Sequence, residues 1–287
     1  MADRSNSTLL SIGHGYSARA LSIRLLAQGW RVIGTTRTAE KAEAIRQTGA
    51  EAVIWPGCDL APLFAEASHL LLSAGPNEAG DPVLTKLQGQ IPENQITWAG
   101  YLSTTGVYGD RAGGWVDETS PCKPATRRGQ WRLTAEQAWN ATPLPMHIFR
   151  LAGIYGPGRG PFAKVRNGTA KRIIKEGQVF SRIHVDDIAS VLEASIARPN
   201  PGSIYNLCDN EAAPPQDVIG HAAELLGVPM PPAIPFEEAE MSQMARSFYA
   251  ESKRCANAKI REELGVELKF PTYREGLADL LARETSG

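Results

Sequence analysis

Three small residues near the start of the chain have the spacing of a phosphate-binding turn. Gly13, Gly15 and Ala18 follow a short apolar run, 9–12, and precede a helical pattern. The first glycine permits a tight turn, the second lets a pyrophosphate approach the backbone, and alanine lets the helix pack closely on the strand. The first turn of such a helix offers free N–H groups and a partial positive charge to the phosphates. The pattern predicts a dinucleotide site made of Gly13, His14, Gly15, Tyr16, Ser17 and Ala18, although a glycine turn in another α/β protein has the same spacing.

The end of the second apolar run selects between the two nicotinamide dinucleotides. An acidic residue there binds the ribose 2′-hydroxyl of NAD, whereas a nearby arginine accommodates the 2′-phosphate of NADP. Thr36 and Arg37 follow the run 31–35, and no acid occurs before Glu40. A charge-assisted hydrogen bond from Arg37 to the phosphate is worth about 1.5–3 kcal/mol, and Thr36 could add a hydroxyl. We therefore predict NADP in preference to NAD; the alternative is that Arg37 is a solvated surface side chain.

Residues after the next two apolar runs complete the expected cofactor site. Asp59 follows the run 52–55, where its carboxylate could accept a hydrogen bond from the adenine amino group or cap a helix. The run 69–73 ends in small residues that would let the cofactor pass close to the backbone. They are Ser73, Ala74 and Gly75.

These residues require a scaffold that brings the ends of several strands together. Six short apolar runs alternate with helical stretches, at 9–12, 31–35, 52–55, 69–73, 95–103 and 146–150. This alternation predicts an α/β protein with a Rossmann-type, doubly wound parallel sheet, whose ligand crevice lies at the carboxyl ends of the strands.

Glycine and proline become frequent after Tyr155, which predicts a smaller C-terminal substrate lobe. We expect residues 1–155 and 178–210 to form the NADP-binding domain. Residues 156–177 and 211–287 would then form the small substrate-binding lobe.

The overall composition limits the partners and the compartment. The 287 residues include 30 basic and 31 acidic side chains, so no overall field attracts nucleic acid or an anionic membrane. No apolar run reaches the ~18 residues that span a bilayer, and the polar N-terminus is unlike a signal peptide. The four cysteines and five histidines are dispersed, without the spacing of a metal site. We expect a cytoplasmic protein with reduced thiols, no catalytic metal and a small-molecule substrate.

Three later segments carry a resemblance to a known group of enzymes. They cover residues 103–109 (STTGVYG), 150–158 (RLAGIYGPG) and 182–189 (RIHVDDIA). In this order, and after the glycine motif, they resemble the extended short-chain dehydrogenase/reductase superfamily, the NAD-dependent epimerase/dehydratase group. The resemblance spans about residues 8–210. It implies an NAD(P) cofactor and, as in many members, a homodimer formed through two surface helices, although the helix near Trp131 could equally be buried within the monomer.

The resemblance also implies roles for single residues. Thr104 matches the active-site Ser/Thr, whose hydroxyl positions the substrate oxygen for hydride transfer. Leu151 stands where many members have proline, in the segment that passes the nicotinamide. Tyr108 and Tyr155 match mainly structural positions, with a catalytic role as the alternative.

The segment 182–189 matches a motif that caps a helix and ties the two lobes together. Asp186 or Asp187 would then cap a helix that begins near Ile188. The alternative for His184 is proton transfer, which its ordinary pKa would suit.

The catalytic Tyr-x-x-x-Lys of the superfamily is absent. With the helix aligned on Glu136, the tyrosine position holds Arg128 and the lysine position holds Arg132. Arginine stays protonated and has no acceptor, so Arg128 could bind an oxyanion, carboxylate or phosphate but is a poor general acid or base. Arg132 could still hold the ribose hydroxyls. The pattern resembles the atypical branch of the superfamily, in which the dinucleotide motif persists while the Tyr/Lys pair is lost.

Two functions fit these observations. The first is an NAD(P)-dependent epimerase, dehydratase or reductase that acts on a polar carbonyl or hydroxyl substrate, with nucleotide sugars among the candidates. Its catalytic residues would be Thr104, Arg128 and Arg132, with another group moving the proton. The second is a catalytically silent NADP(H)-binding regulator or redox sensor, which the missing tyrosine favours. The retained glycines and Arg37 argue against a protein that binds no cofactor.

Overall fold

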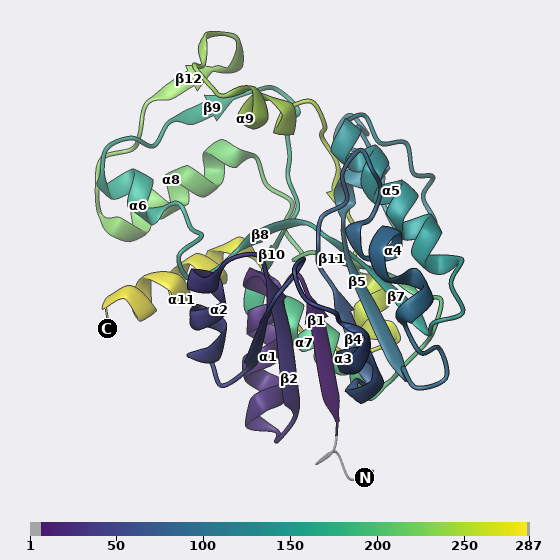
Figure 1. Ribbon diagram of the computed structural model, residues 1–287. Coiled ribbons are helices and arrows are strands. Elements are labelled where there is room, and N and C mark those ends of the chain that lie inside the picture. The colour runs from purple at the N-terminus through teal and green to yellow at the C-terminus, as the bar shows by residue number, and fades with distance from the viewer. Residues whose placement is uncertain (1–6, 286–287) are drawn as a thin grey trace.

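A seven-stranded parallel sheet carries most of the apolar runs of the chain (Figure 1). In this computed structural model, which describes residues 7–285, the strands lie in the order β11-β7-β5-β4-β1-β2-β3. They are β1 (Thr8–Ile12), β2 (Arg31–Thr36), β3 (Glu51–Ile54), β4 (His69–Leu72), β5 (Trp98–Thr104), β7 (Met146–Leu151) and β11 (Ile204–Leu207). The order changes direction between β1 and β4, which creates a crevice at the carboxyl ends of these strands. The predicted Rossmann-type fold is confirmed.

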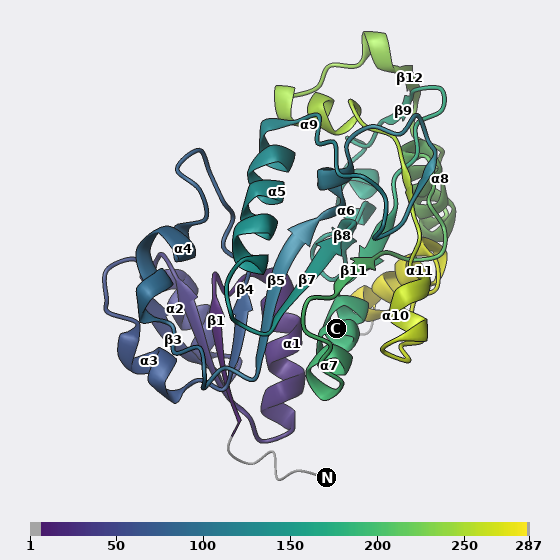
Figure 2. The same cartoon turned by 90° about the vertical axis from the view of Figure 1, so that its right-hand side faces the viewer.

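Helices cover both faces of the sheet, so its central strands are buried on both sides (Figure 2). One face packs against α1 (Tyr16–Ala27), α2 (Ala39–Arg46) and α7 (Val185–Ala197). The other face packs against α3 (Ala61–Glu66), α4 (Pro82–Leu87) and α5 (Arg127–Asn140).

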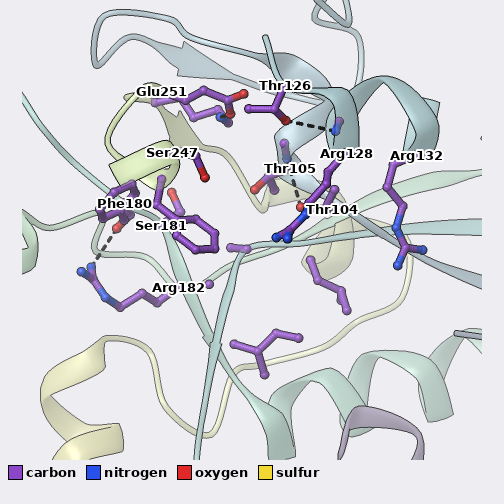
Figure 3. Close-up of a pocket in the computed structure, with 18 of the residues that line it drawn as sticks. Thr104, Thr105, Thr126, Arg128, Arg132, Phe180, Ser181, Arg182, Ser247 and Glu251 are labelled. Atoms are coloured by element: carbon purple, nitrogen blue, oxygen red, sulfur yellow. Dashed lines mark hydrogen bonds and ion pairs between the residues drawn. The ribbon is translucent and has the colours of Figure 1, made fainter. Parts of the chain in front are cut away.

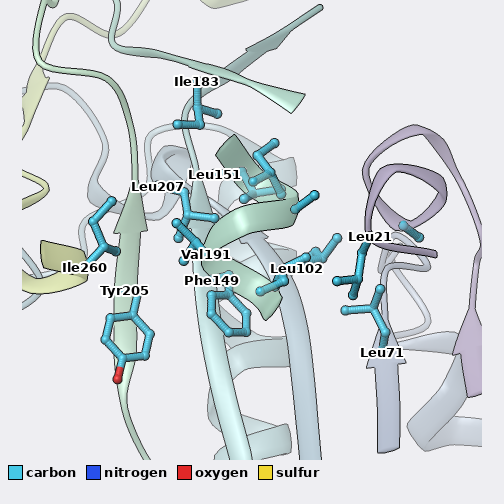
Figure 4. Close-up of a cluster of buried hydrophobic side chains, with 14 of the residues drawn as sticks. Leu21, Leu71, Leu102, Phe149, Leu151, Ile183, Val191, Tyr205, Leu207 and Ile260 are labelled. Carbon is cyan, nitrogen blue, oxygen red and sulfur yellow. The ribbon is translucent and has the colours of Figure 1, made fainter. Parts of the chain in front are cut away.

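Branched and aromatic side chains fill the first of these two layers (Figure 4). Leu21 of α1 and Val191 of α7 are fully buried there, in one cluster with Leu71, Leu102 and Phe149 of the sheet. This apolar packing holds the strand ends in fixed positions beneath the crevice.

A smaller lobe stands beyond the carboxyl ends of the strands (Figure 1). It has its own apolar cluster, formed by α6 (Phe162–Arg166), α8 (Pro215–Leu226) and α11 (Tyr273–Thr285). A two-stranded sheet of β9 (Arg172–Ile174) and β12 (Ala233–Pro235) extends it, followed by η3 (Phe236–Glu238) and α9 (Gln243–Phe248).

Part of the C-terminal third returns to the sheet domain. The strand β13 (Arg254–Cys255) pairs with β6 (Trp115–Val116), and α10 (Ala258–Glu262) follows. Cys255, Ile260 and Leu264 belong to the same buried cluster as Phe149 of the sheet. Residues near 254–266 therefore pack against the large domain, although they fall within the range that we expected to form the substrate lobe.

Short elements complete the fold. These are η1 (Gln88–Gln90), η2 (Thr105–Tyr108), β8 (Gly153–Tyr155) and β10 (Arg182–His184). β10 pairs in parallel with β8 and not with the main sheet, to which the following strand, β11, belongs. Within residues 7–285, no helix combines the length and apolar character needed to cross a membrane.

Candidate functional site

The glycine turn lies between the ends of β1 and β4. Gly13 has a φ of +82°, and an added Cβ would lie 2.6 Å from the backbone nitrogen of Ala74. Its N–H donates to Thr35 Oγ1 at 3.0 Å, and its carbonyl accepts a hydrogen bond from the Ser73 hydroxyl. The small residues Ser73 and Ala74 therefore allow the ends of β1 and β4 to lie close together, in addition to any contact with a ligand.

Gly15 precedes the first turn of α1 and is exposed. An added Cβ there would meet nothing closer than the Gly13 carbonyl at 3.7 Å. No side chain caps the N-terminus of α1, while Ser17 and Ala18 are buried against the sheet. The open space and the uncapped helix leave room for an anionic group at this position.

His14 faces inward from the turn. Its ring fills the space beside Gly34, where an added Cβ would lie 2.6 Å from the ring. Burial, with a smaller effect from Arg19, lowers the pKa of His14 to about 4. The imidazole is therefore neutral. It packs against Gly34 of β2 and does not face the crevice.

The residues predicted to bind the adenosine half lie at the ends of β2 and β3. Arg37 is exposed, and Thr36 is half-buried. The Asp59 carboxylate accepts a hydrogen bond from the Ala61 N–H at 3.0 Å, at the start of α3. Asp59 is not the N-cap of α3, because that position is Leu60 and makes no side-chain cap hydrogen bond. The carboxylate instead binds the first N–H of the helix from the residue before the cap.

One face of α5 carries Arg128, Arg132 and Glu136, each one turn from the next. Glu136 forms a buried ion pair with Arg150 of β7 at 2.8 Å, and both side chains are 4% exposed. The carboxylate of Glu136 also accepts a hydrogen bond from Ser103. This pair fixes the rotation of α5, which directs the two arginines toward the ends of β4, β5 and β7.

Tyr108 belongs to the same buried network. Its hydroxyl donates to Asn206 Oδ1 at 2.7 Å and accepts from Arg150 at 3.0 Å. Burial raises its pKa. Tyr155 donates to the Thr272 carbonyl at 3.5 Å, and burial raises its pKa as well. Both hydroxyls are used in structural contacts.

The segment 182–189 joins the large domain to the C-terminal residues. Helix α7 begins at Val185, and its cap is the His184 ring, which accepts a hydrogen bond from the Asp186 N–H at 3.1 Å. The expected cap by an aspartate is therefore wrong, because the helix starts three residues earlier than Ile188. Asp187 instead accepts hydrogen bonds from the backbone N–H groups of residues 269 and 270.

His184 itself is fully buried. Burial is the main cause that lowers its pKa to about 4, against the opposing charge of Asp186. The ring is neutral near pH 7 and lies outside the lining of the cavity described next.

A cavity of about 970 Å³ lies between the strand ends and the lobe (Figure 3). Gly75, Thr104 and Leu151 line it from the sheet, and Arg128 and Arg132 line it from α5. Predicted cofactor and catalytic residues thus meet in one space. The glycine turn and Arg37 lie outside this lining, along the same edge of the sheet.

Thr104 and Arg128 are brought together by close packing of α5 on η2. Gly129 is buried, and an added Cβ would lie 2.9 Å from the Gly106 carbonyl. The Thr104 hydroxyl oxygen accepts a hydrogen bond from the Gly106 N–H at 3.1 Å. Its own proton remains available to a ligand oxygen.

Arg132 is tied to the sheet. Its Nη1 donates to the Leu102 carbonyl at 2.7 Å and to the Tyr101 hydroxyl at 3.1 Å. An added Cβ on Gly75 would lie 3.6 Å from its Nη2. The other guanidinium nitrogen therefore lies beside the turn that follows β4.

The cavity also contains charged residues that were not among the predicted site residues. Lys253 is 9% exposed, and its Nζ donates to the Gly109 carbonyl at 2.9 Å and to Glu251 at 2.6 Å. Arg159 and Arg182 also line the cavity. Its lining contains five cationic side chains, Arg128, Arg132, Arg159, Arg182 and Lys253, and one acid, Glu251.

This excess of positive charge suits an anionic ligand. No local motif surrounds Glu251 and Lys253, so only the folded chain identifies them. Within residues 7–285, no group of three or more His, Cys, Asp or Glu side chains could hold a metal ion.

Comparisons with known proteins find the same fold in solved structures. No family model matches it. A solved structure of a conserved protein of unknown function from Silicibacter pomeroyi is 58% identical, with a TM-score of 0.92, over 97% of this chain and 99% of that one. UDP-glucose 4-epimerase from Bifidobacterium longum, solved in complex with NAD+ and UDP, has a TM-score of 0.72 and 20% identity, over 98% and 99% of the two chains. The second similarity shows a shared fold.

Two curated proteins are also similar in sequence. Protein YeeZ from Escherichia coli K12 is 29% identical over 278 residues, which cover 91% of this chain and 95% of that protein. A 3-diazoavenalumate denitrifying reductase from Streptomyces is 30% identical over 173 residues, or 57% of this chain and 55% of that protein.

Proposed function

We propose that this chain, which belongs to the same family as the Silicibacter pomeroyi protein of unknown function, is an NAD(P)-dependent oxidoreductase of the atypical short-chain dehydrogenase/reductase type. One observation carries the proposal: Thr104, Arg128 and Leu151 line one cavity at the carboxyl ends of the sheet strands. The complex of the Bifidobacterium epimerase with NAD+ and the name of the Streptomyces reductase support it. The substrate is a polar carbonyl or hydroxyl compound.

The residues of the crevice fit a dinucleotide. The space in front of Gly15 and the uncapped start of α1 suit its pyrophosphate, and the exposed Arg37 suits a 2′-phosphate. When bound, the nicotinamide would supply or accept the hydride. Thr104 would donate a hydrogen bond to the substrate oxygen, and Arg128 would stabilise the negative charge that develops on it.

The proton requires a group other than the arginines, because arginine does not release one near pH 7. Two other side chains that carry a proton, those of Cys255 and Tyr249, also line the cavity. Burial raises the pKa of Cys255 to about 11 and also raises the pKa of Tyr249. We assign the proton transfer to Lys253, a residue of the cavity lining whose ammonium group forms an ion pair with Glu251 at 2.6 Å. In a reduction, Lys253 would give a proton to the substrate oxygen as the hydride reaches the carbonyl carbon, and the amine would then be reprotonated from solvent.

Substitution of Arg37 tests the cofactor preference. We expect Arg37→Glu to weaken NADPH binding by about 10–100-fold, because one charge-assisted hydrogen bond is lost and a repulsive charge is added. The affinity for NADH should stay within about twofold. Fluorescence titration with each reduced cofactor measures both affinities.

The control for this charge reversal is Arg46→Glu, at the far end of α2, where Arg46 contacts Glu43 on the surface. It should leave both affinities unchanged. If the wild-type protein binds NADH more tightly than NADPH, the preference is refuted.

The enzyme itself is tested by a screen for NADPH oxidation and for nucleotide-sugar turnover. For any substrate found, Thr104→Ala should lower kcat/KM about 100-fold, whereas Thr104→Ser should retain most activity. The affinity for NADPH should not change in either variant. Thr134→Ala, on the exposed side of α5, is the matched control.

Turnover that survives Thr104→Ala would remove this residue from the mechanism. The second candidate function is a silent NADP(H)-binding regulator or redox sensor, which the arginines at positions 128 and 132 favour. Tight NADPH binding without turnover in a broad screen would support the sensor and refute the enzyme.

A further inference from the structure

The loop that follows β8 reaches across to the glycine turn of the large domain. Gly156 lies against Tyr16, the first residue of α1, and an added Cβ would lie 2.5 Å from the Tyr16 hydroxyl. That hydroxyl donates a hydrogen bond to the Pro157 carbonyl at 2.9 Å. The absence of a side chain at Gly156 thus lets the tyrosine dock beneath the loop.

The same loop presents Arg159 above the tyrosine ring. Two backbone hydrogen bonds between Gly156 and Arg159, at 2.8 and 3.2 Å, close the loop. The guanidinium carbon lies 4.3 Å from the centroid of the Tyr16 ring, a cation–π contact. Tyr16, which directly follows Gly15, therefore positions Arg159 of the lobe.

The position of Arg159 suits an anion. Its side chain lines the large cavity, and within residues 7–285 none of the ion pairs includes it. The N-terminus of α1 beneath it lacks a side-chain cap. An anion placed between them would contact backbone N–H groups on one side and a guanidinium on the other.

We propose that Arg159 binds the pyrophosphate of the dinucleotide from the lobe side and that Tyr16 is its positioning residue. The cofactor is then held between the start of α1 and the loop 156–160. This inference rests on the proposed function, since it requires a dinucleotide in the crevice. It adds a binding residue that lies far from the glycine motif in the sequence.

Binding of two ligands to one set of variants tests the proposal. NADPH contains the pyrophosphate, whereas adenosine 2′-monophosphate contains the adenine and the 2′-phosphate without it. Arg159→Gln should weaken NADPH binding by about 10–100-fold and leave the affinity for adenosine 2′-monophosphate unchanged. Arg37→Glu should weaken the binding of both ligands.

The matched control is Arg166→Gln on α6. Arg166 is a lobe arginine with an exposed ion pair to Glu284 at 2.5 Å and a cation–π contact to Phe162. This variant should bind NADPH like the wild type. Tyr16→Ala should weaken NADPH binding as Arg159→Gln does, while Tyr16→Phe, which keeps the ring, should weaken it less.

The outcomes separate this proposal from the proposed function. If folded Arg159→Gln binds NADPH within twofold of the wild type, the pyrophosphate role of Arg159 is wrong and the dinucleotide site stands. Equal weakening for NADPH and adenosine 2′-monophosphate would also overturn it, because the effect would then not depend on the pyrophosphate. If the wild type binds no dinucleotide, both proposals fail together.

Discussion

Replacement of Arg150 by methionine is expected to lower the free energy of unfolding by about 3–5 kcal/mol. Arg150 and Glu136 form an ion pair in which each side chain is only 4% exposed. The substitution leaves the carboxylate buried without its cation, and a buried unpaired charge is strongly destabilising. Urea unfolding followed by circular dichroism measures the change.

A double-mutant cycle separates the loss of the ion pair from the cost of leaving one charge buried and unpaired. Glu136→Leu combined with Arg150→Met removes both charges, and we expect the double variant to be more stable than Arg150→Met alone. Arg46→Met breaks an exposed pair with Glu43 at 3.3 Å and should change stability by at most about 0.5 kcal/mol. A loss below about 1 kcal/mol for Arg150→Met would contradict the assigned role of this pair.

The second prediction with a large effect concerns Lys253, the residue proposed to supply the proton. For any substrate that the protein reduces, Lys253→Met should lower kcat by about 10²–10⁴-fold, the usual contribution of a positioned acid or base. Lys253→Arg retains the positive charge, but an arginine side chain is not deprotonated in proteins, so this variant should be nearly as slow. Steady-state kinetics over a range of pH, with the affinity for NADPH measured beside it, provides the readout.

Control experiments distinguish this role from a structural one. The Lys253 ammonium group also donates to the Gly109 carbonyl, so the thermal stability of each variant must be measured. Lys259→Met, which breaks a surface contact with Glu263 at 3.7 Å in the same segment of the chain, should not affect kcat. Full turnover in Lys253→Arg would show that the charge, and not the proton, is required.

The sequence by itself determined the features that depend on neighbouring residues. Gly13, Gly15 and Ala18 act within one turn between a strand and a helix, so their spacing predicts the turn directly. The alternation of apolar runs and helices predicted the parallel sheet, because short crossovers between parallel strands leave few arrangements. Alignment on Glu136 placed Arg128 and Arg132 on one helix face, and both line the cavity.

Only the tertiary structure decided which distant segments meet at the site. The hydrogen bond between Lys253 and Gly109 spans 144 positions, and that between Tyr16 and Pro157 spans 141. Such contacts depend on how the lobe packs on the sheet, which no local periodicity encodes. The inward rotation of His14 was likewise undetermined, because a residue's position in a motif does not fix the direction of its side chain. The site residues at the strand ends could therefore be predicted from the sequence. The residues on the lobe side of the cavity could be identified only in the folded chain.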